Sequence, residues 1–154
     1  MKRAEILVGL PYSGKSTYAR ASTGFQVVST DSFIEEYADS VHKTYDQVFN
    51  EETYNKALIN MNTQLYSYLG SGVDIIWDQT NLTKLSRAKK ISTLKDQFGY
   101  TVVAVVFPVL DKKTLQERMY DRAAKIVPHR VLDDMRKRYQ VPSLDEGFDE
   151  IIFI

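Results

Sequence analysis

The sequence predicts a single α/β domain of three layers, in which helices cover both faces of a five-stranded parallel sheet. Strand-like and helix-like segments alternate along all 154 residues, which is the order that produces parallel sheets. Residues 75–77 and 102–106 are continuous apolar runs, as expected of strands buried on both faces. A glycine-rich loop between the first strand and the first helix is the third observation that favours this fold.

Each element is predicted from the local spacing of apolar residues and from the turn and capping residues at its ends. Apolar runs bounded by turn residues predict strands, and polar segments with apolar residues every three or four positions predict helices. Gly70-Ser71-Gly72 and Gly99 suit left-handed C-caps, Thr83 and Asp111 suit N-caps, and Pro128 suits a first helical turn. We expect strands at residues 4–8, 26–29, 73–77, 101–107 and 150–154, and helices at residues 15–21, 32–38, 45–69, 84–98, 112–123 and 129–139.

Composition is that of an ordinary globular domain, with 44% hydrophobic and 26% charged residues. The absence of cysteine excludes disulfides, a thiolate nucleophile and a cysteine-based metal site. No apolar run approaches the length of a membrane helix, and residues 1–3 lead directly into the first strand without room for a signal peptide. We therefore expect a cytoplasmic protein with no membrane partner.

Charge is distributed unevenly although the net charge is zero. Residues 84–138 hold 14 Lys and Arg against 6 Asp and Glu, a local excess of +8, and the segments on either side are both acidic. Such an excess predicts a contact with a polyanion, either nucleotide phosphates alone or a nucleic-acid backbone as well. The alternative is that these residues are the solvated faces of amphipathic helices.

The glycine-rich loop is the most specific motif. Residues 9–16 have the sequence Gly-Leu-Pro-Tyr-Ser-Gly-Lys-Ser, which matches G-x-x-x-x-G-K-[ST] between a strand and a helix start. Gly9 and Gly14 allow backbone N–H groups to converge on phosphate oxygens. Lys15 can reach the β- and γ-phosphates and the Ser16 hydroxyl can ligate Mg²⁺. The loop predicts a site for ATP or another nucleoside triphosphate with Mg²⁺, which also includes Tyr12, Ser13 and Thr17.

Tyr12 is the unusual residue of this loop. Glycine is common at such positions, and bulky side chains disfavour a positive φ. The sequence offers no reason for its presence.

Carboxylates follow two of the predicted strands. Asp31 comes just after residues 26–29, where it can accept a proton from an attacking hydroxyl, cap the helix that begins at Ser32, or do both. Asp78 follows residues 73–77, the position at which a Mg²⁺ or acceptor ligand is expected after a phosphate loop. We expect the three polar residues behind it both to line the same edge of the site and to cap the helix from Lys84: Gln79, Thr80 and Asn81.

A helical hairpin at about residues 112–138 predicts a lid over the nucleotide. Arg118, Arg122 and Lys125 follow one another at spacings of four and three, which places them on one helical face. Lids of this kind supply arginines that neutralise the transferring phosphoryl group, so Arg122 is a candidate catalytic residue with Asp31 and Lys15. The alternative is a set of surface ion pairs.

Together these motifs resemble the kinase domain of phage and animal polynucleotide 5′-hydroxyl kinases. The resemblance rests on the phosphate loop, on Thr30-Asp31-Ser32, on residues 78–82 with Arg87, and on residues 115–128 of the lid. The tail at residues 141–148 is similar to the segment that closes the animal domain. The likeness therefore extends from one end of the chain to the other and implies a P-loop kinase fold.

The resemblance implies a role for each matching residue. Lys15 and Ser16 would bind the nucleotide and Mg²⁺, Asp31 would activate the acceptor hydroxyl, and Arg122 with Arg118 would contact the donor phosphates. On the acceptor side it implies Val127 against the terminal base, together with Asp78, Gln79, Thr80, Asn81 and Arg87.

The chain also departs from this family. Thr30 and Ile34 stand where the phage enzyme has arginines that hold the acceptor. Gln79 aligns with its second acceptor-site aspartate, whereas the animal pattern places an aspartate at Asp78. No Asp-x-Asp-x-Thr phosphatase motif is present.

The expected function is transfer of the γ-phosphoryl group of ATP to a hydroxyl, foremost the 5′-OH end of DNA or RNA. Two alternatives stay open. One is a kinase for another hydroxyl, in a nucleoside, a modified DNA base, an aminoacyl-tRNA or a sugar. The other is a nucleotide-dependent switch or NTPase module. The sequence leaves the acceptor, the choice between ATP and GTP, and the oligomeric state open.

Overall fold

The computed structural model describes residues 1–122 and 125–154. Its strands are β1 (Arg3–Val8), β2 (Gln26–Val28), β3 (Ile75–Trp77), β4 (Thr101–Val106) and β5 (Glu150–Phe153). The helices are α1 (Lys15–Ala21), α2 (Thr30–Ser40), α3 (Tyr45–Val48), α4 (Glu51–Ser71), α5 (Lys84–Ser92), α6 (Lys112–Asp121) and α7 (His129–Arg138). Short π- and 3₁₀-helical segments, η1 (Thr93–Gln97) and η2 (Leu144–Glu146), follow α5 and α7.

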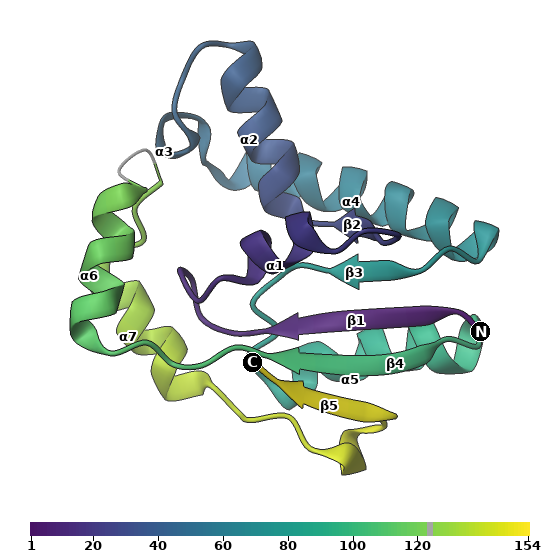
Figure 1. Ribbon diagram of the computed structural model, residues 1–154. Coiled ribbons are helices and arrows are strands. Elements are labelled where there is room, and N and C mark those ends of the chain that lie inside the picture. Colours follow the sequence, from purple (N-terminus) through teal and green to yellow (C-terminus); the bar gives the residue numbers. More distant parts are fainter. Residues whose placement is uncertain (123–124) are drawn as a thin grey trace.

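The five strands form one sheet in the order β2-β3-β1-β4-β5, and every described pairing is parallel. In register, Ala4 of β1 lies between Ile75 of β3 and Val102 of β4. All carboxyl ends therefore meet at one edge, where α2, α3 and the lid also lie (Figure 1). Ligands of open α/β sheets bind at this edge. The predicted fold class is confirmed.

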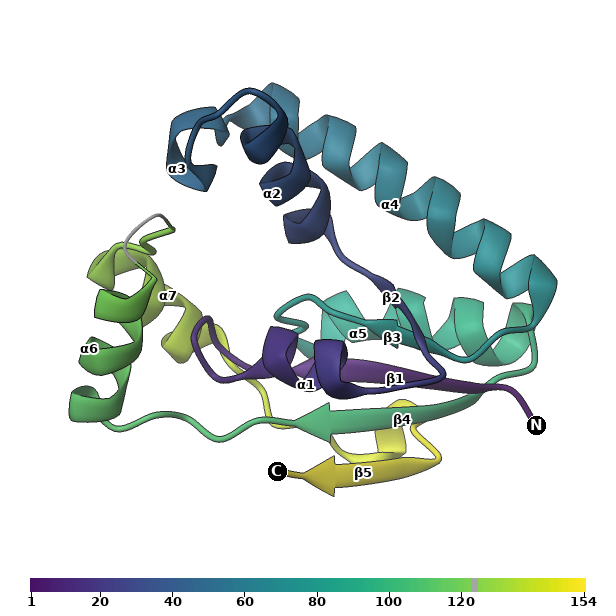
Figure 2. The same cartoon turned by 45° about the horizontal axis from the view of Figure 1, so that its top comes forward.

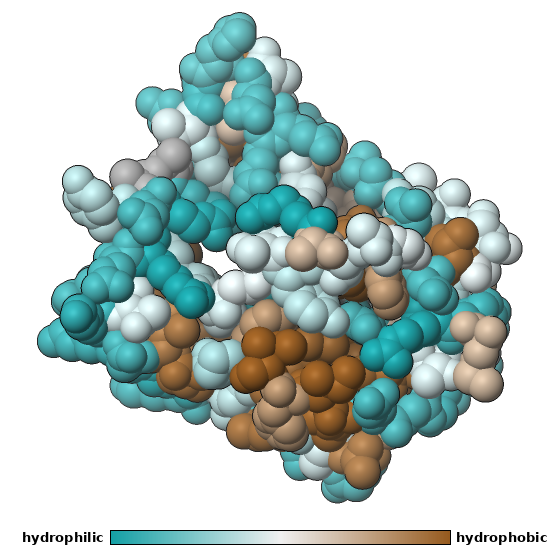
Figure 3. Space-filling model, viewed as in Figure 1, coloured by the Kyte–Doolittle hydropathy of each residue, from teal (hydrophilic) through white to brown (hydrophobic). Residues whose placement is uncertain are grey.

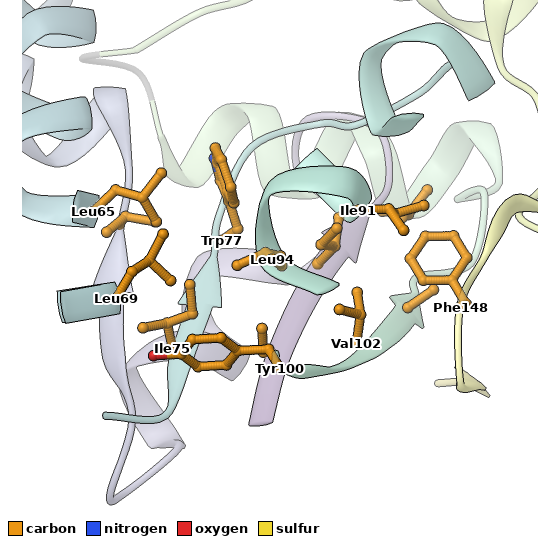
Figure 4. Close-up of a cluster of buried hydrophobic side chains, with 14 of the residues drawn as sticks. Leu65, Leu69, Ile75, Trp77, Ile91, Leu94, Tyr100, Val102 and Phe148 are labelled. Carbon is orange, nitrogen blue, oxygen red and sulfur yellow. The ribbon is translucent and has the colours of Figure 1, made fainter. Parts of the chain in front are cut away.

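Two hydrophobic clusters hold the layers together. On one face of the sheet, α4 and α5 cover a large cluster that includes Leu65, Leu69, Ile91 and Trp77 (Figure 4). On the other face, Ala19 of α1 contacts a smaller cluster built from alternate residues of the strands. Figure 2 shows α1 and α4 on opposite sides of the sheet. Central strands with both faces covered explain the continuous apolar runs of the sequence.

Two long predicted helices are each divided in the structure. The predicted helix at residues 45–69 is interrupted after Val48, because Asn50 takes extended backbone and its side chain caps α4 by accepting from the Thr53 N–H at 2.8 Å. The predicted helix at 84–98 changes from α to π geometry at Thr93. Thr83, Asp111 and Gly72 form the expected caps.

The start of α2 corrects one expectation. Ser29, and not Asp31, is the N-cap residue, and its hydroxyl accepts from the Ser32 N–H. Asp31 lies in the first turn of the helix, which leaves its carboxylate available for other contacts. The sixth predicted segment, 112–123, is helical to Asp121, and its final residue lies outside the described residues.

None of the described helices combines the length and apolar character that crossing a membrane requires.

Candidate active site

The phosphate loop joins β1 to α1 in a strained conformation. Gly14, the N-cap of α1, has φ of 102°, a value that favours glycine, whereas Tyr12 has φ of 69° despite its large side chain. The Gly9 N–H donates to the Thr80 carbonyl at 3.0 Å, which fixes the loop to the segment after β3. A Cβ at Gly9 would lie 2.8 Å from Ser13 Oγ, so this glycine is required by close packing.

Lys15 and Ser16 start α1 beside the end of β3. The Lys15 ammonium is buried and donates to the Leu10 carbonyl at 2.9 Å, and burial lowers its pKa to about 8 against the attraction of Asp78 and Asp31. The Ser16 hydroxyl donates to the Asp78 carboxylate at 3.0 Å. Burial raises the pKa of Asp78, and the Lys15 charge and the Ser16 hydrogen bond oppose that shift. The three side chains thus form one coupled polar group.

Asp31 lies on the same edge and is held by two donors. The Tyr45 hydroxyl donates to Oδ1 at 2.8 Å, and the Lys125 ammonium donates to Oδ2 at 2.7 Å. Burial alone would raise the pKa of Asp31, but the charge and hydrogen bond of Lys125 and the Tyr45 hydrogen bond outweigh it and hold the pKa below its ordinary value. Asp31 is therefore a carboxylate at neutral pH, with lone pairs left for a further donor.

The lid consists of α6, α7 and the segment that joins them. Arg118 extends over the phosphate loop and donates to the Tyr12 carbonyl at 2.6 Å. Arg122 instead lies 3.7 Å from the Glu35 carboxylate of α2, with its side chain 42% exposed. Figure 3 shows the surface hollowed between α2, the lid and the phosphate loop. Of the two predicted lid arginines, Arg118 is thus the one on the loop in this structure.

Tyr12 has a clear structural role that sequence reasoning missed. Its ring is 7% exposed and packs with Leu115 and Leu132 of the lid. Its hydroxyl accepts from the Val127 N–H at 2.8 Å and donates to the Lys125 carbonyl at 3.1 Å. A tyrosine in this loop therefore connects the loop to the lid.

A small, mainly apolar cavity lies beside the phosphate loop, under the lid. The residues around it come from the loop, from the segment after β4 and from both lid helices, and they include Leu10, Ser13, Pro108, Leu132 and Arg136. Ser13 Oγ is the one buried side-chain oxygen or nitrogen, among the described residues, that makes no hydrogen bond. The volume of the cavity is about 10 Å³, which is room for about one water molecule.

The polar groups of the segment after β3 form hydrogen bonds with different partners. Gln79 Oε1 accepts from the Trp77 indole at 3.1 Å and from Lys90 at 2.8 Å. Asn81 is buried, has φ of 49°, and donates through Nδ2 to the Leu7 carbonyl at 2.7 Å. Thr80 contributes its carbonyl to Gly9. The segment thus braces the phosphate loop.

Three further predicted site residues have partners other than Asp31 and Asp78. Arg87 is completely buried and forms a two-point ion pair with Glu146, at 2.8 and 3.0 Å, so the structure does not bring it to the acceptor side. Val127 belongs to the hydrophobic cluster around Tyr12. Thr17 is exposed and its hydroxyl accepts from Arg20 at 3.5 Å.

Sequence reasoning also missed residues that complete the site. Tyr45 and Lys125 hold Asp31, and Lys90 lies 5.0 Å over the Trp77 ring with a pKa lowered to about 8 by burial. Sequence reasoning named Lys125 only as a member of one helical face with Arg118 and Arg122, and that prediction is wrong because α6 ends at Asp121. Tyr45 and Lys90 carried no signal, because their partners, 9 to 14 residues earlier, belong to other elements of the fold.

Comparison with solved structures supports the fold. A kinase candidate from Chloroflexus aurantiacus is 21% identical, with 99% of this chain and 84% of that chain covered and a TM-score of 0.72. A chain of the Pnkp1/Rnl/Hen1 RNA repair complex is 19% identical, with 89% of this chain and 43% of that chain covered and a TM-score of 0.68. A sugar kinase from Janibacter is 17% identical, with 100% and 85% covered and a TM-score of 0.63.

These likenesses show a shared α/β fold of the P-loop kinase type, in which residues 9–16 span the loop between the first strand and the start of the first helix. No curated protein sequence matches the chain. The family model described as AAA domain matches residues 5–142, and this protein belongs to that family.

Proposed function

We propose that this protein is an ATP- and Mg²⁺-dependent phosphotransferase that moves the γ-phosphoryl group to a hydroxyl, with the 5′-OH end of DNA or RNA as acceptor. The observation that carries the proposal is the position of Asp31. An ionised carboxylate with free lone pairs lies on the same edge as Lys15 and the Ser16–Asp78 pair. A nucleotide switch has no need of such a base beside its phosphate loop.

The residues on this edge divide the chemistry of phosphoryl transfer. Asp31 accepts the proton of the acceptor hydroxyl as its oxygen attacks the γ-phosphorus. The Lys15 charge and the N–H groups at the start of α1 stabilise the negative charge on the phosphates. Arg118 and Arg122 of the lid add positive charge and exclude water when the lid is closed.

The oxygen ligands that Ser16 and Asp78 offer fit Mg²⁺. Ser16 Oγ and Asp78 Oδ2 are a hydroxyl and a carboxylate oxygen 3.0 Å apart, and Mg²⁺ prefers one or two such oxygens with phosphates and waters. Within residues 1–122 and 125–154, no three His, Cys, Asp or Glu side chains cluster as a metal cage. Bound there, the ion would neutralise charge on the β- and γ-phosphates.

Three observations support a nucleic-acid acceptor. Residues 84–138 carry an excess of eight positive charges, and they include the lid next to Asp31. The motifs of the whole chain resemble polynucleotide kinases. A structurally similar chain belongs to an RNA repair complex.

A second candidate is a kinase for a smaller or different hydroxyl compound, such as a nucleoside, a modified DNA base, an aminoacyl-tRNA or a sugar. It is favoured by Thr30 and Ile34, which are uncharged and 5% and 0% exposed where the phage enzymes hold the acceptor with arginines. The similarity to a sugar kinase agrees with it.

One experiment separates these candidates. The protein is incubated with γ-labelled ATP and Mg²⁺ against 5′-OH DNA, 5′-OH RNA, nucleosides, tRNA and sugars, and each acceptor is tested for label. Labelled oligonucleotide ends are the expected result. Label on a small acceptor alone supports the second candidate, and ATP consumption with no labelled acceptor contradicts both.

The role of Asp31 is tested by Asp31→Asn, with Asp39→Asn on the exposed side of α2 as the matched control. Loss of the base lowers transfer by about 10² or more and leaves ATP affinity nearly unchanged, and the control stays at the wild-type rate. Near-normal turnover of Asp31→Asn contradicts the assignment. Arg122→Ala is expected to lower kcat more than it raises the acceptor KM, and an effect on the acceptor KM alone places Arg122 outside the donor site.

A further inference from the structure

Tyr12 is held in place by contacts that go beyond packing. It has a positive φ and a ring that is 7% exposed, and a tyrosine in such backbone is strained. Its hydroxyl makes two hydrogen bonds, both to the main chain of the lid, at the Lys125 carbonyl and the Val127 N–H. Its own carbonyl accepts from Arg118. Through this one residue the phosphate loop is therefore connected to Arg118 of α6 and to Lys125 and Val127. We call the described residues 125–128, which precede α7, the lid turn.

The side chain of Lys125 continues this connection to α2. Its ammonium lies 2.7 Å from Asp31 Oδ2, 3.5 Å from the Glu35 carboxylate and 4.5 Å from the centre of the Tyr45 ring. The next residue also faces this side, because the Ile126 N–H donates to the Asp46 carboxylate at 3.0 Å. The lid turn is thus fixed between the phosphate loop and the carboxylates of α2 and α3.

We propose that Tyr12 and Lys125 are positioning residues for the transfer reaction: Tyr12 holds the lid turn so that the Lys125 ammonium orients the Asp31 carboxylate toward the acceptor hydroxyl. This inference rests on the proposed function, in which Asp31 is the base. The inference gives Tyr12 of the phosphate loop a function. It also means that the orientation of Asp31 depends on closure of the lid over the donor nucleotide.

The geometry leaves Asp31 able to react. An ionised carboxylate has about four lone-pair sites, and Tyr45 and Lys125 occupy one on each oxygen. The remaining sites can accept the acceptor O–H. In the transfer, that O–H bond breaks and its proton goes to Asp31, a bond forms between the acceptor oxygen and the γ-phosphorus, and the bond from the γ-phosphorus to the leaving ADP oxygen breaks. The Lys125 ammonium, 2.7 Å from Oδ2, compensates the carboxylate charge before the proton arrives.

The proposal predicts a change in the pH dependence of kcat/KM when Lys125 is removed. The charged and titratable groups that face Asp31 are Lys125 and Arg122 of the lid, Lys15 of the phosphate loop, Tyr45 of α3, Glu35 of α2 and Asp78 after β3. Lys125 contributes most to the low pKa of Asp31. A carboxylate with a lowered pKa loses its function only as the pH falls through that value. Removal of Lys125 raises the pKa of Asp31, so the acid limb of kcat/KM moves to higher pH.

The test uses Lys125→Met, Tyr12→Phe and the double variant, with Lys56→Met on the exposed face of α4 as the control. Transfer from γ-labelled ATP to a 5′-OH DNA oligonucleotide is followed against pH, and the Asp31 carboxyl is titrated by carbon-13 NMR. For Lys125→Met we expect kcat to fall about 10- to 100-fold, an ATP KM within about threefold of wild type, and a higher Asp31 pKa. Tyr12→Phe should move the same pKa in the same direction, and the double variant should be no worse than Lys125→Met.

The two proposals fail in different ways. If the Asp31 pKa in Tyr12→Phe and Lys125→Met equals that of wild type, or if the two effects on kcat are simply additive, the connection through Tyr12 is overturned whatever the acceptor is. If instead the NMR shifts appear but Asp31→Asn transfers phosphate at the normal rate, the positioning contact stands and the assignment of Asp31 as the base is overturned.

Discussion

The buried ion pair between Arg87 and Glu146 offers the sharpest test of how this fold holds its loops. The two side chains are 0% and 8% exposed and meet through two hydrogen bonds of 2.8 and 3.0 Å. Arg87 also donates to the Asn81 carbonyl at 2.9 Å, which connects α5, the segment after β3 and the C-terminal tail. The sequence resemblance assigns Arg87 to the acceptor site, whereas this geometry assigns it to stability.

Arg87→Met removes the charge and keeps most of the volume. Glu146 is then a buried carboxylate whose remaining partner, of those described, is the Ser143 N–H, and the Asn81 carbonyl loses its side-chain donor. Loss of one partner of a buried pair costs about 3–5 kcal/mol. In a domain of this size that corresponds to a fall in Tm of roughly 6–20 °C.

Urea unfolding measures this loss, with Lys89→Met on the exposed face of α5 as the control. Arg87→Met/Glu146→Leu should recover part of it, because no unpaired charge remains. At a temperature where the variant is folded, the acceptor KM should be unchanged. An unfolding free energy within about 1 kcal/mol of wild type, together with a raised acceptor KM, would refute the structural role and restore the binding role.

Two further predictions concern the phosphate loop. Gly9→Ala places a methyl group 2.8 Å from Ser13 Oγ and 3.0 Å from Phe107 Cβ, so stability should fall by about 1–3 kcal/mol and nucleotide affinity should weaken, whereas Gly70→Ala in the open interior of α4 should stabilise by about 0.5–1 kcal/mol. Equal thermal shifts for the two variants would contradict this. Because burial lowers the pKa of Lys15 to about 8 and bound phosphates favour its protonated form, nucleotide binding at pH 8 should take up about half a proton, and less at pH 6.5. Calorimetry in buffers of different ionisation enthalpy measures the uptake, and an uptake that is independent of pH would contradict the assignment.

The sheet and the phosphate loop could be predicted because their signals are local. The phosphate loop, its strand and its helix are contiguous, and each strand was a short apolar run bounded by turn residues. Helix ends were predicted well where a single side chain caps the helix, as at Thr83 and Asp111. They were predicted poorly where two candidates compete. Ser29 and Asp31 are both good capping residues, and extended backbone at Ser29 decides between them.

The partners of the candidate base could not be predicted, because they come from distant parts of the chain. Lys125 and Asp31 are 94 residues apart, and Val127 and Tyr12 are 115 apart. Nothing in the local pattern of residues 9–16 indicates that a tyrosine there would reach a lid more than 100 residues away. The same holds for Arg87, whose partner is 59 residues further along the chain.

This division between local and distant contacts has a consequence for specificity. In the proposed function the donor phosphates meet the phosphate loop, which Thr80 and Asn81 brace. In the same proposal the acceptor meets Asp31 of α2, whose carboxylate is held by Tyr45 of α3 and by Lys125 of the lid. Changes in the lid or in α3 can therefore alter the acceptor without altering the donor. Proteins that share this loop can accordingly differ widely in the hydroxyl they phosphorylate, and Tyr45 and Lys125 are the positions at which we expect that difference to be set.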